Sequence, residues 1–514
     1  MASAAATPRP MAGITLAVTS VALALGTFMQ VLDSTIANVS LPTIAGNLGV
    51  SADNSTWVIT SFAVANGISV PLTGWLMGRF GVVRTFVMSV ALFTLASFLC
   101  GIAWNLGSLI IFRVIQGAVS GPMIPGSQAL LISIFPPEKR STALGIWSMT
   151  TFVAPVAGPI LGGYICDNYH WSWIFLINLP VGLLCALVCR ANLADRETPT
   201  RKLKIDTVGL GLLVIWVGAL QIMLDLGKNE DWFHSPIVVA AAIVAVIAFL
   251  TWVIWELTDA NPAVDLSLFR HRNFAFGTLA FSLGYALFFA NILILPLWLQ
   301  TQLGYTAFWA GLVAAPSGVV AVLFSPLMAR LSGKVDARIL ASGAFVAFGI
   351  SYLMRAGYTS YGGFWDFTFP LLVQGLGMSV FFLAMINVQL DGIPPECIPS
   401  ATGISNFARI TGGSFAASII TTAWDRREAL HQNRLADTLR PGTPAYDGAV
   451  RTFDAMGVGQ LKGAAILTRD MVGQSYLLAS IDLFWICGWL SFAMIGVIWL
   501  TRRPKPITGP VAAE

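Results

Sequence analysis

The sequence predicts an all-α protein that crosses a membrane many times, and three observations lead to this prediction. Hydrophobic residues make up 56% of the 514 residues and charged residues only 11%, whereas soluble domains carry about 25% charged residues. Apolar segments long enough to cross the hydrocarbon core recur along the whole chain. The chain also repeats part of its own sequence at a constant spacing.

An apolar helix of about 20 residues spans a bilayer. The segments of this kind lie at 14–38, 55–77, 85–104, 107–134, 142–164, 172–190, 207–226, 236–256, 274–299, 307–329, 338–356, 366–390, 400–424 and 476–500, and they predict 14 transmembrane helices. Basic residues concentrate in the connections on the same side as the two chain ends, which predicts cytoplasmic termini. In the short outer connections we find only Lys228, with Arg355 expected at a helix end.

The internal repeat divides the chain into two halves. Ile115-Gln116-Gly117 matches Val373-Gln374-Gly375 at an offset of 258. Parallel halves of this kind indicate two parallel six-helix bundles with a site between them near the membrane midplane. We therefore expect a cytoplasmic tail at 1–13, an N-terminal bundle at 14–190, a linker with two extra transmembrane helices at 191–273, a C-terminal bundle at 274–500 and a cytoplasmic tail at 501–514.

Polar residues inside the predicted spans mark the candidate site, because a charge at the bilayer centre costs about 2.5–3.5 kcal/mol on insertion scales. In the first span, Gln30, Asp33 and Asn38 share one helical face, and Asp33 is its only acid. Burial favours a protonated carboxyl group, so Asp33 facing a central cavity could take up a proton outside and release it inside. The alternative is an Asp33 at the outer interface that merely bonds a neighbour.

Four further polar residues complete this set. In the fourth span Arg113 shares a stripe with Gln116, either to tune a carboxylate or as a fixed structural ion pair. Arg409 in the thirteenth span would meet an anionic substrate or Asp33, or would only hold helices together. Asn291 is a candidate hydrogen-bonding residue of a pocket. The candidate substrate-binding residues are Gln30, Asn38, Gln116, Asn291 and Arg409.

Several kinds of chemistry have no sequence signal. The chain contains no G-x-x-x-x-G-K-[ST], no G-x-S-x-G and no H-E-x-x-H pattern, and its six cysteines lack metal-ligand spacing. No dense Lys/Arg cluster indicates nucleic-acid binding. We therefore expect no catalytic residue, no metal and no cofactor, with a proton gradient as the energy source; a membrane-embedded enzyme or a sensor is the weaker alternative.

Five segments resemble the motifs of a known family. LDSTIANVSLP (32–42), GWLMGRFGVVR (74–84), FRVIQGAVSG (112–121), APVAGPILGG (154–163) and WSWIFLINLP (171–180) are similar to motifs of the major facilitator superfamily, in its branch of fourteen-spanner drug:proton antiporters. The resemblance implies a gating role for Gly74, Arg79, Gly81 and Arg84 in the loop motif, and for Pro155, Gly158, Pro159, Gly162 and Gly163 in the fifth-span motif. The loop motif usually has an aspartate where this chain has Gly78.

The resemblance also implies a function. It implies proton-driven multidrug efflux of hydrophobic or amphipathic toxic compounds from the bacterial inner membrane by alternating access, with Asp33 as coupling acid and Arg113 as its partner. An EmrA-like periplasmic adaptor and a TolC-like outer-membrane channel would complete the conduit. The alternative is a dedicated exporter of one compound class, such as a fatty acid or a siderophore. The outer loop at 425–475 would dock the adaptor or would be only a solvated excursion.

Overall fold

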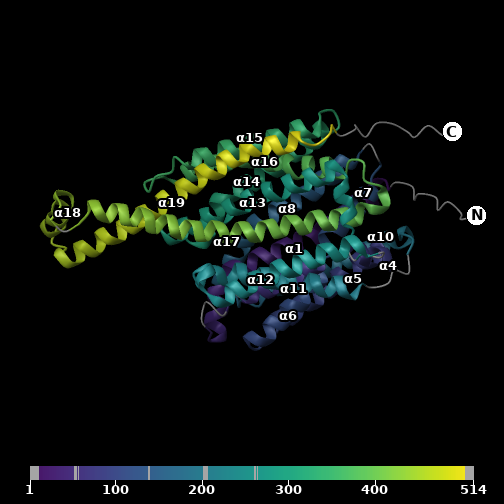
Figure 1. Ribbon diagram of the computed structural model, residues 1–514, viewed down its shortest axis with the longest axis horizontal. Helices are drawn as coiled ribbons and strands as arrows, with labels where there is room; N and C mark the ends of the chain where they lie inside the picture. Colours follow the sequence, from purple (N-terminus) through teal and green to yellow (C-terminus); the bar gives the residue numbers. More distant parts are fainter. Residues whose placement is uncertain are drawn as a thin grey trace, which may run out of the picture.

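The helices of the protein lie roughly along one common axis, as expected for chains that cross a bilayer repeatedly (Figure 1). This computed structural model describes residues 11–50, 55, 57–136, 139–200, 206–259, 262, 264–440 and 442–503, and within them the regular structure is helical. The first half contains α1 (Gly13–Leu48), α3 (Trp57–Ser69), α4 (Thr73–Phe80), α5 (Val82–Gly101), α6 (Leu106–Ser120), α7 (Met123–Ile134), α8 (Arg140–Asn168), α9 (Trp173–Leu176) and α10 (Asn178–Leu193).

The rest of the chain adds two helices and then the second half. The two intervening helices are α11 (Thr207–Asn229) and α12 (Pro236–Thr258). The second half contains α13 (Arg272–Thr301), α14 (Ala307–Ser332), α15 (Ala337–Arg355), α16 (Phe364–Leu390), α17 (Ile398–Thr438), α18 (Pro444–Ala455) and α19 (Gln460–Trp499).

Each predicted span overlaps a helix. Within the described ranges, 11 helices are long and apolar enough to cross a membrane, or up to 12 if the bent pair α3–α4 counts as one span. The 29-residue α8 and the 41-residue α17 are further long helices. The total of fourteen spans stays a prediction. The multi-pass membrane character is plain.

The second predicted span, at 55–77, is divided into two helices. Its two parts, α3 and α4, meet at an angle of 58°. Pro71 lies in the break between them, and a proline lacks the backbone N–H that a continuous helix needs and clashes with the preceding turn.

The internal repeat reappears in the packing of each half. A Cβ atom on Gly117 of α6 would lie 2.5 Å from the Phe62 carbonyl oxygen of α3. A Cβ atom on Gly375 of α16 would lie 2.5 Å from the Ser317 carbonyl oxygen of α14. In both bundles, therefore, the glycine after the repeated glutamine lets the fourth helix touch the backbone of the second.

The two bundles meet along α8 and α14, and again where α17 crosses α4 and α7. Asn406 of α17 donates a hydrogen bond to Gln128 of α7 at 3.2 Å. A Cβ atom on Gly145 of α8 would lie 3.3 Å from Ala329 Cβ of α14. The added helix α11 contacts α3 and α17, one helix of each bundle, and α12 packs on α11.

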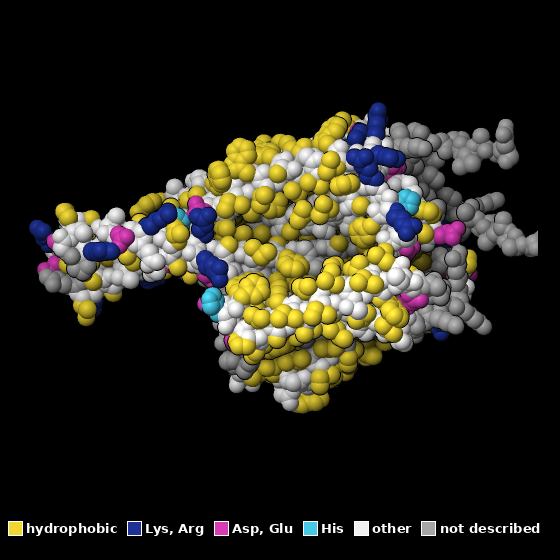
Figure 2. Space-filling view, in the orientation of Figure 1, with side chains coloured by type: hydrophobic (Ala, Val, Ile, Leu, Met, Phe, Trp, Pro, Cys, Tyr) yellow, Lys and Arg dark blue, Asp and Glu magenta, His cyan; other side chains and the backbone are white. Residues whose placement is uncertain are grey.

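The surface agrees with a membrane-embedded body. Figure 2 shows hydrophobic side chains spread over the middle of the visible face, while Lys, Arg, Asp and Glu gather towards the two ends. Exposed apolar residues such as Leu323, at 69%, and Ile254, at 64%, are costly in water but favourable against lipid chains.

The predicted outer loop at 425–475 is largely helical. The helix α17 has 41 residues and α19 has 40. At 1.5 Å per residue each is roughly 60 Å long, about twice the hydrocarbon thickness. The two helices therefore extend past the body as a hairpin that carries α18 at its far end (Figure 1).

Candidate functional site

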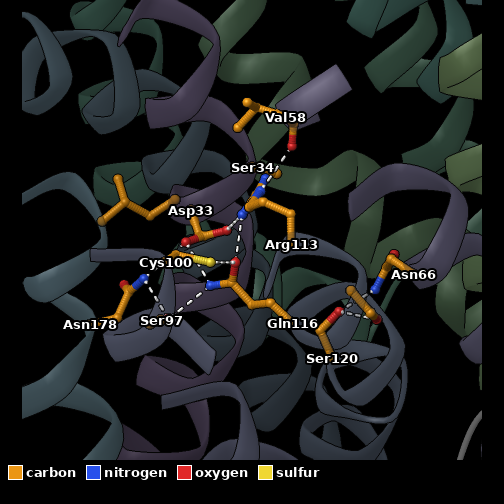
Figure 3. Close-up of polar contacts among 12 residues, drawn as sticks. Asp33, Ser34, Val58, Asn66, Ser97, Cys100, Arg113, Gln116, Ser120 and Asn178 are labelled. Carbon is orange, nitrogen blue, oxygen red and sulfur yellow. Dashed lines mark hydrogen bonds and ion pairs between the residues drawn. The ribbon is translucent and has the colours of Figure 1, made fainter. Parts of the chain in front are cut away.

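A fully buried ion pair occupies the N-terminal bundle (Figure 3). Asp33 lies in the middle of α1 and Arg113 lies on α6, and neither side chain is exposed. Arg113 Nη1 donates to Asp33 Oδ2 at 2.6 Å. Removing two charges from water is costly, and only a close pair with further hydrogen bonds offsets that cost.

Neutral amides complete the coordination of the carboxylate. Gln116 Nε2 and Asn178 Nδ2 each donate to Asp33 Oδ1 at 3.0 Å. Both amides also donate to the Ser97 hydroxyl, at 2.8 and 3.3 Å. The carboxylate thus accepts hydrogen bonds from α6 and α10, and its charge links α1 to both helices.

The guanidinium group is held on its other sides by α3 and by aromatic rings. Arg113 Nε donates to the Val58 carbonyl oxygen at 2.9 Å, and Nη1 also donates to Gln116 Oε1 at 2.7 Å. The guanidinium carbon lies 4.2 Å from the centre of the Phe62 ring and 5.5 Å from that of Phe175. Its Nη2 has no partner in the part of the chain that the structure describes.

The position of Asp33 differs from the sequence-based expectation. We expected this carboxyl group to face the cavity between the bundles, but its hydrogen-bond partners belong to the N-terminal half and its exposed fraction is 0%. Around Asp33 the polar face of α1 points into the N-terminal bundle, because the amides of α6 and α10 donate hydrogen bonds to the carboxylate there. The ion pair itself agrees with the proposed partnership of Asp33 and Arg113.

Close to Asp33, α1 packs tightly against α8. A Cβ atom on Gly158 would lie 2.2 Å from Thr35 Oγ1, and one on Gly162 would lie 2.9 Å from Ile36 Cγ1. Thr35 follows Asp33 by only two positions, and its hydroxyl donates to the Ala154 carbonyl oxygen at 3.4 Å. Two glycines of the fifth-span motif therefore permit the close contact with the helix that carries the acid.

The remaining members of that motif also lie in α8. The helix continues without a break through Pro155 and Pro159. Gly163 is buried and Pro155 is half-buried, whereas the Pro159 side chain lies outside the described part of the structure. The hinge role of the two prolines stays a prediction.

The loop motif forms the connection between α4 and α5. A Cβ atom on Gly74 would lie 2.9 Å from Ser400 Cα at the start of α17, which brings the two bundles together here. Arg79 lies 5.6 Å from the centre of the Trp75 ring. Gly81 has a φ of 92°, which only glycine adopts without strain, and its missing Cβ leaves room for the Glu197 side chain.

Glu197 binds the first turn of α5. Its Oε1 accepts from the Val83 N–H at 3.0 Å, and its Oε2 accepts from the Arg84 N–H at 2.8 Å. A carboxylate at a helix N-terminus satisfies free N–H groups and interacts favourably with the helix dipole. Gly78 offers no carboxylate in this loop, and the chain supplies one from the segment that follows α10.

Arg409 lies on α17, one turn after Asn406, whose side chain donates to Gln128 of the N-terminal bundle. It is 2% exposed, and its Nε donates to Asn406 Oδ1 at 3.3 Å. Its guanidinium carbon lies 4.5 Å from the centre of the Tyr285 ring. Among the described residues it makes no ion pair, and it does not reach Asp33, which was one of its two predicted partners.

The other predicted substrate residues are dispersed. Gln116 belongs to the Asp33 cluster, and Gln30 is buried in α1 with an Oε1 atom that lacks a partner among the described residues. Asn291 lies inside the C-terminal bundle, where its Nδ2 donates to the Leu287 carbonyl oxygen at 2.8 Å. Asn38 falls on α1, but its side chain lies outside the described residues.

Three residues of the site and its surroundings were not predicted from the sequence. Ser97 and Asn178 complete the Asp33 cluster, and Glu197 binds α5. Arg355 lies at a helix end as predicted, since it is the last residue of α15, but its side chain is fully buried and not exposed at an interface. Asn178 stands in an otherwise apolar segment, a signal that could have identified it; Glu197 carries no such signal. No metal-holding group of three or more His, Cys, Asp or Glu occurs within the described ranges.

A two-bundle helical membrane protein with a buried ion pair in its first bundle is a transporter architecture. The family model of the Major Facilitator Superfamily matches residues 23–417, so the chain belongs to this superfamily of secondary transporters. It is 46% identical over 499 residues to "Multidrug export protein EmrB" of Escherichia coli (strain K12), covering 96% of this chain and 97% of that protein.

Two further comparisons extend this result. The chain is 42% identical over 495 residues to "Fatty acid resistance protein FarB" of Neisseria gonorrhoeae, covering 96% of this chain and 98% of that protein. The solved structure of the human organic anion transporter MFSD10 matches with a TM-score of 0.58 at 12% identity, covering 94% of this chain and 99% of that one. The structural match supports the fold alone.

Proposed function

We propose that the protein is a proton-coupled antiporter that exports hydrophobic or amphipathic toxic compounds, and that it works by alternating access. In this proposal the bundles at 14–190 and 274–500 move against each other, and the linker at 191–273 lies at their side. The observation that carries the proposal is the buried pair of Asp33 and Arg113, with both side chains unexposed and their charged atoms 2.6 Å apart.

Protonation of this pair has a mechanical consequence. A proton on Asp33 removes the negative charge, whereas Arg113 keeps its positive charge at any accessible pH. A buried charge without its counter-charge is strongly unfavourable, so α1 and α6 must rearrange or admit water when Asp33 is protonated. Proton binding thereby becomes coupled to the conformation of the bundle.

A continuous set of contacts leads from Asp33 to the bundle interface. Thr35 of α1 touches Gly158 of α8, and α8 packs along α14 of the other bundle. On that seam, the Ser325 hydroxyl donates to the Gly145 carbonyl oxygen at 3.4 Å. A shift of α1 therefore displaces α8, which is the helix that sets the distance between the bundles.

The breadth of the substrate range is inferred from the relatives and from the interface. The similar proteins EmrB and FarB are named for multidrug export and for fatty acid resistance. Next to Arg409 the C-terminal bundle presents the rings of Phe281, Tyr285 and Phe382. Aromatic rings around one cation suit amphipathic molecules, because they offer a large apolar area beside a polar group.

The membrane placement belongs to the same proposal. Both termini lie in the cytoplasm of a bacterial cell and the body lies in its inner membrane, so the hairpin of α17, α18 and α19 stands in the periplasm. At its far end Met456 is 70% and Leu461 is 86% exposed. We assign this hairpin end to an EmrA-like adaptor, which a TolC-like channel extends through the outer membrane. Exchange of Met456 and Leu461 for serine is expected to reduce co-purification of the adaptor without reducing transport in vesicles.

The coupling role of Asp33 is tested by proton release. Binding of a cationic drug to purified protein in weakly buffered detergent solution is expected to release protons, because substrate and proton compete for alternative states. The Asp33→Asn variant is expected to bind the drug without releasing protons. Release of protons by this variant equal to that of the unmodified protein would assign coupling to another group. Asp225→Asn, an acid of α11 outside the cluster, is the matched control.

A dedicated exporter of fatty acids is the second candidate, favoured by the absence of an ion pair at Arg409 among the described residues. A carboxylate head group would pair with this guanidinium while its chain lies on the Tyr285 ring. Arg409→Gln is expected to lower protection of a sensitive strain against long-chain fatty acids roughly tenfold and to leave protection against neutral drugs unchanged. Equal losses for both classes contradict this assignment.

A further inference from the structure

Arg355 is a permanent charge in the interior of the C-terminal bundle, and the proposed transport mechanism does not use it. Its side chain is 0% exposed. Its Nη2 donates to the Ser351 hydroxyl at 3.3 Å and to Gln374 Oε1. Its guanidinium carbon lies 5.3 Å from the centre of the Tyr352 ring and 5.7 Å from that of Phe484. All four of these partners are neutral.

The negative charge that would balance Arg355 is missing from its surroundings. Among the described residues Arg355 makes no ion pair, in contrast to Arg113, whose guanidinium group meets Asp33. The arginine ends α15, and the C-terminal helix dipole supplies only about half an elementary charge, shared with solvent. A guanidinium group does not lose its proton in proteins, so it cannot become neutral by titration.

The internal repeat shows how the imbalance arises. Gln374 occupies the place of Gln116 at the offset of 258, and Asn291 lies on α13, the first helix of its bundle, as Asp33 lies on α1. In the N-terminal bundle the repeated glutamine meets an arginine that has a carboxylate. In the C-terminal bundle it meets Arg355, and no described acid pairs with this arginine.

Two hydrogen-bond donors in this cluster are unused. Arg355 Nε and the Tyr352 hydroxyl are buried and have no partner within the described part of the chain. An unmade hydrogen bond of a buried charged group costs more than that of a neutral one. Both donors come from the last turns of α15, so an acceptor with negative charge would satisfy them together.

A groove at the end of the bundle is lined by sequence neighbours of Arg355. An open groove of about 650 Å³ is lined by Met354, Gly357, Tyr358 and Pro370, among others. Tyr358 lies close to Arg355 along the chain, and its backbone N–H donates to the Arg355 carbonyl oxygen at 3.0 Å. Asp366 also lines the groove, but its Oδ2 accepts from the Gly363 N–H at 2.8 Å, so this carboxylate is engaged at the rim.

We propose that the C-terminal bundle binds one small inorganic anion, of the size and charge of chloride, beside Arg355 and Tyr352. The anion takes the place that the Asp33 carboxylate has in the other bundle. It accepts hydrogen bonds from the free guanidinium nitrogen and the phenol, and it neutralises the buried charge. It stabilises the bundle and is not transported.

Thermal unfolding of the purified full-length protein tests this site. Chloride is added against gluconate at constant ionic strength, since gluconate is too large to enter. The unfolding midpoint is expected to rise with chloride and to saturate, as mass action requires for a ligand of the folded state. Bromide is expected to act like chloride, and acetate tests whether a small carboxylate can replace the halide. A midpoint that is the same in chloride and in gluconate overturns the proposal.

Two variants locate the effect. Arg355→Gln is expected to weaken the chloride response at least roughly tenfold, because the anion loses its charged partner. Asn291→Asp supplies an internal carboxylate from α13, the first helix of this bundle, so this variant is expected to be stable in gluconate and insensitive to chloride. It remains informative if the Arg355 variant fails to fold. Arg338→Gln, on a guanidinium already paired with Asp336 at 2.8 Å, is the matched control and keeps the response. An undiminished chloride response in Asn291→Asp contradicts the site.

Discussion

At the scale of single residues, the pair of Asp33 and Arg113 is the central feature of the N-terminal bundle. Two opposite charges are buried together, and three neutral groups from α5, α6 and α10 hold them in place. A pair of this kind contributes little net stability compared with apolar residues, but the loss of one partner is costly. The pair therefore matters less for stability than for the rearrangement that follows when one partner loses its charge.

This asymmetry predicts a double-mutant cycle for stability. Asp33→Asn and Arg113→Gln are each expected to lower the free energy of unfolding by about 3–5 kcal/mol, because each leaves one buried charge. The double variant, which buries no charge, is expected to be more stable than the sum of the two losses implies. Thermal unfolding in detergent measures the three variants. Additive losses would show that the two side chains do not act as one unit.

Gly158 is the second residue with a defined consequence, because it determines how closely α8 approaches α1. A Cβ atom there would lie 2.2 Å from Thr35 Oγ1, so Gly158→Ala is expected to destabilise by about 1–3 kcal/mol through overpacking and to slow transport. Gly218→Ala on α11 is the control, since no atom lies within 4 Å of its Cβ position. That variant is expected to be neutral or slightly stabilised. Equal stability and equal transport rates of the two variants would show that the contact of Gly158 with Thr35 has no role in transport.

At the scale of helices, the segment after α10 is fastened to the start of α5 by Glu197. Glu197→Ala is expected to cost about 1 kcal/mol, as for other lost helix caps, and to increase proteolysis of the segment around residues 194–200. Asp195→Ala is the matched control, because Asp195 is an exposed acid on the same segment. Limited proteolysis of membranes measures the effect. Identical cleavage of the two variants would argue against the cap.

The helices were the most predictable part of the molecule, because apolar length alone determines which segments cross a bilayer. Pro71 indicates the bend between α3 and α4, but the sequence analysis did not predict it. The hairpin of α17, α18 and α19 was predicted only as a loop. In α17 the residues after Trp424 are polar, and hydropathy cannot distinguish a solvated helix from a solvated loop.

The site was only partly predictable for a related reason. Charges inside spans identified Asp33, Arg113 and Arg409, since their cost in a bilayer singles them out. Neutral partners cost less in a bilayer, so Asn178 gave a weaker signal than the charges and Ser97 gave none. The direction in which the Asp33 side chain points depends on the rotation of α1 about its own axis. Packing against the other helices of the bundle determines this rotation.

At the scale of the whole molecule, the proposed mechanism converts a local change of charge into a movement of two bundles. The charge lies on α1, the close contact lies between α1 and α8, and the interface lies between α8 and α14. Each link consists of packed side chains or backbone, which shift between discrete arrangements and do not deform continuously. The C-terminal bundle provides the opposing surface and, through Arg409, the polar part of the interface.

The most direct test is transport by the full-length protein in sealed proteoliposomes with an imposed proton gradient. The unmodified protein and Asp225→Asn are expected to move a cationic dye against its gradient. Asp33→Asn is expected to lose gradient-driven transport by at least roughly a hundredfold while still exchanging labelled for unlabelled dye when no gradient is imposed. Gradient-driven transport by Asp33→Asn at the rate of the unmodified protein would contradict the role of the buried pair as the coupling element.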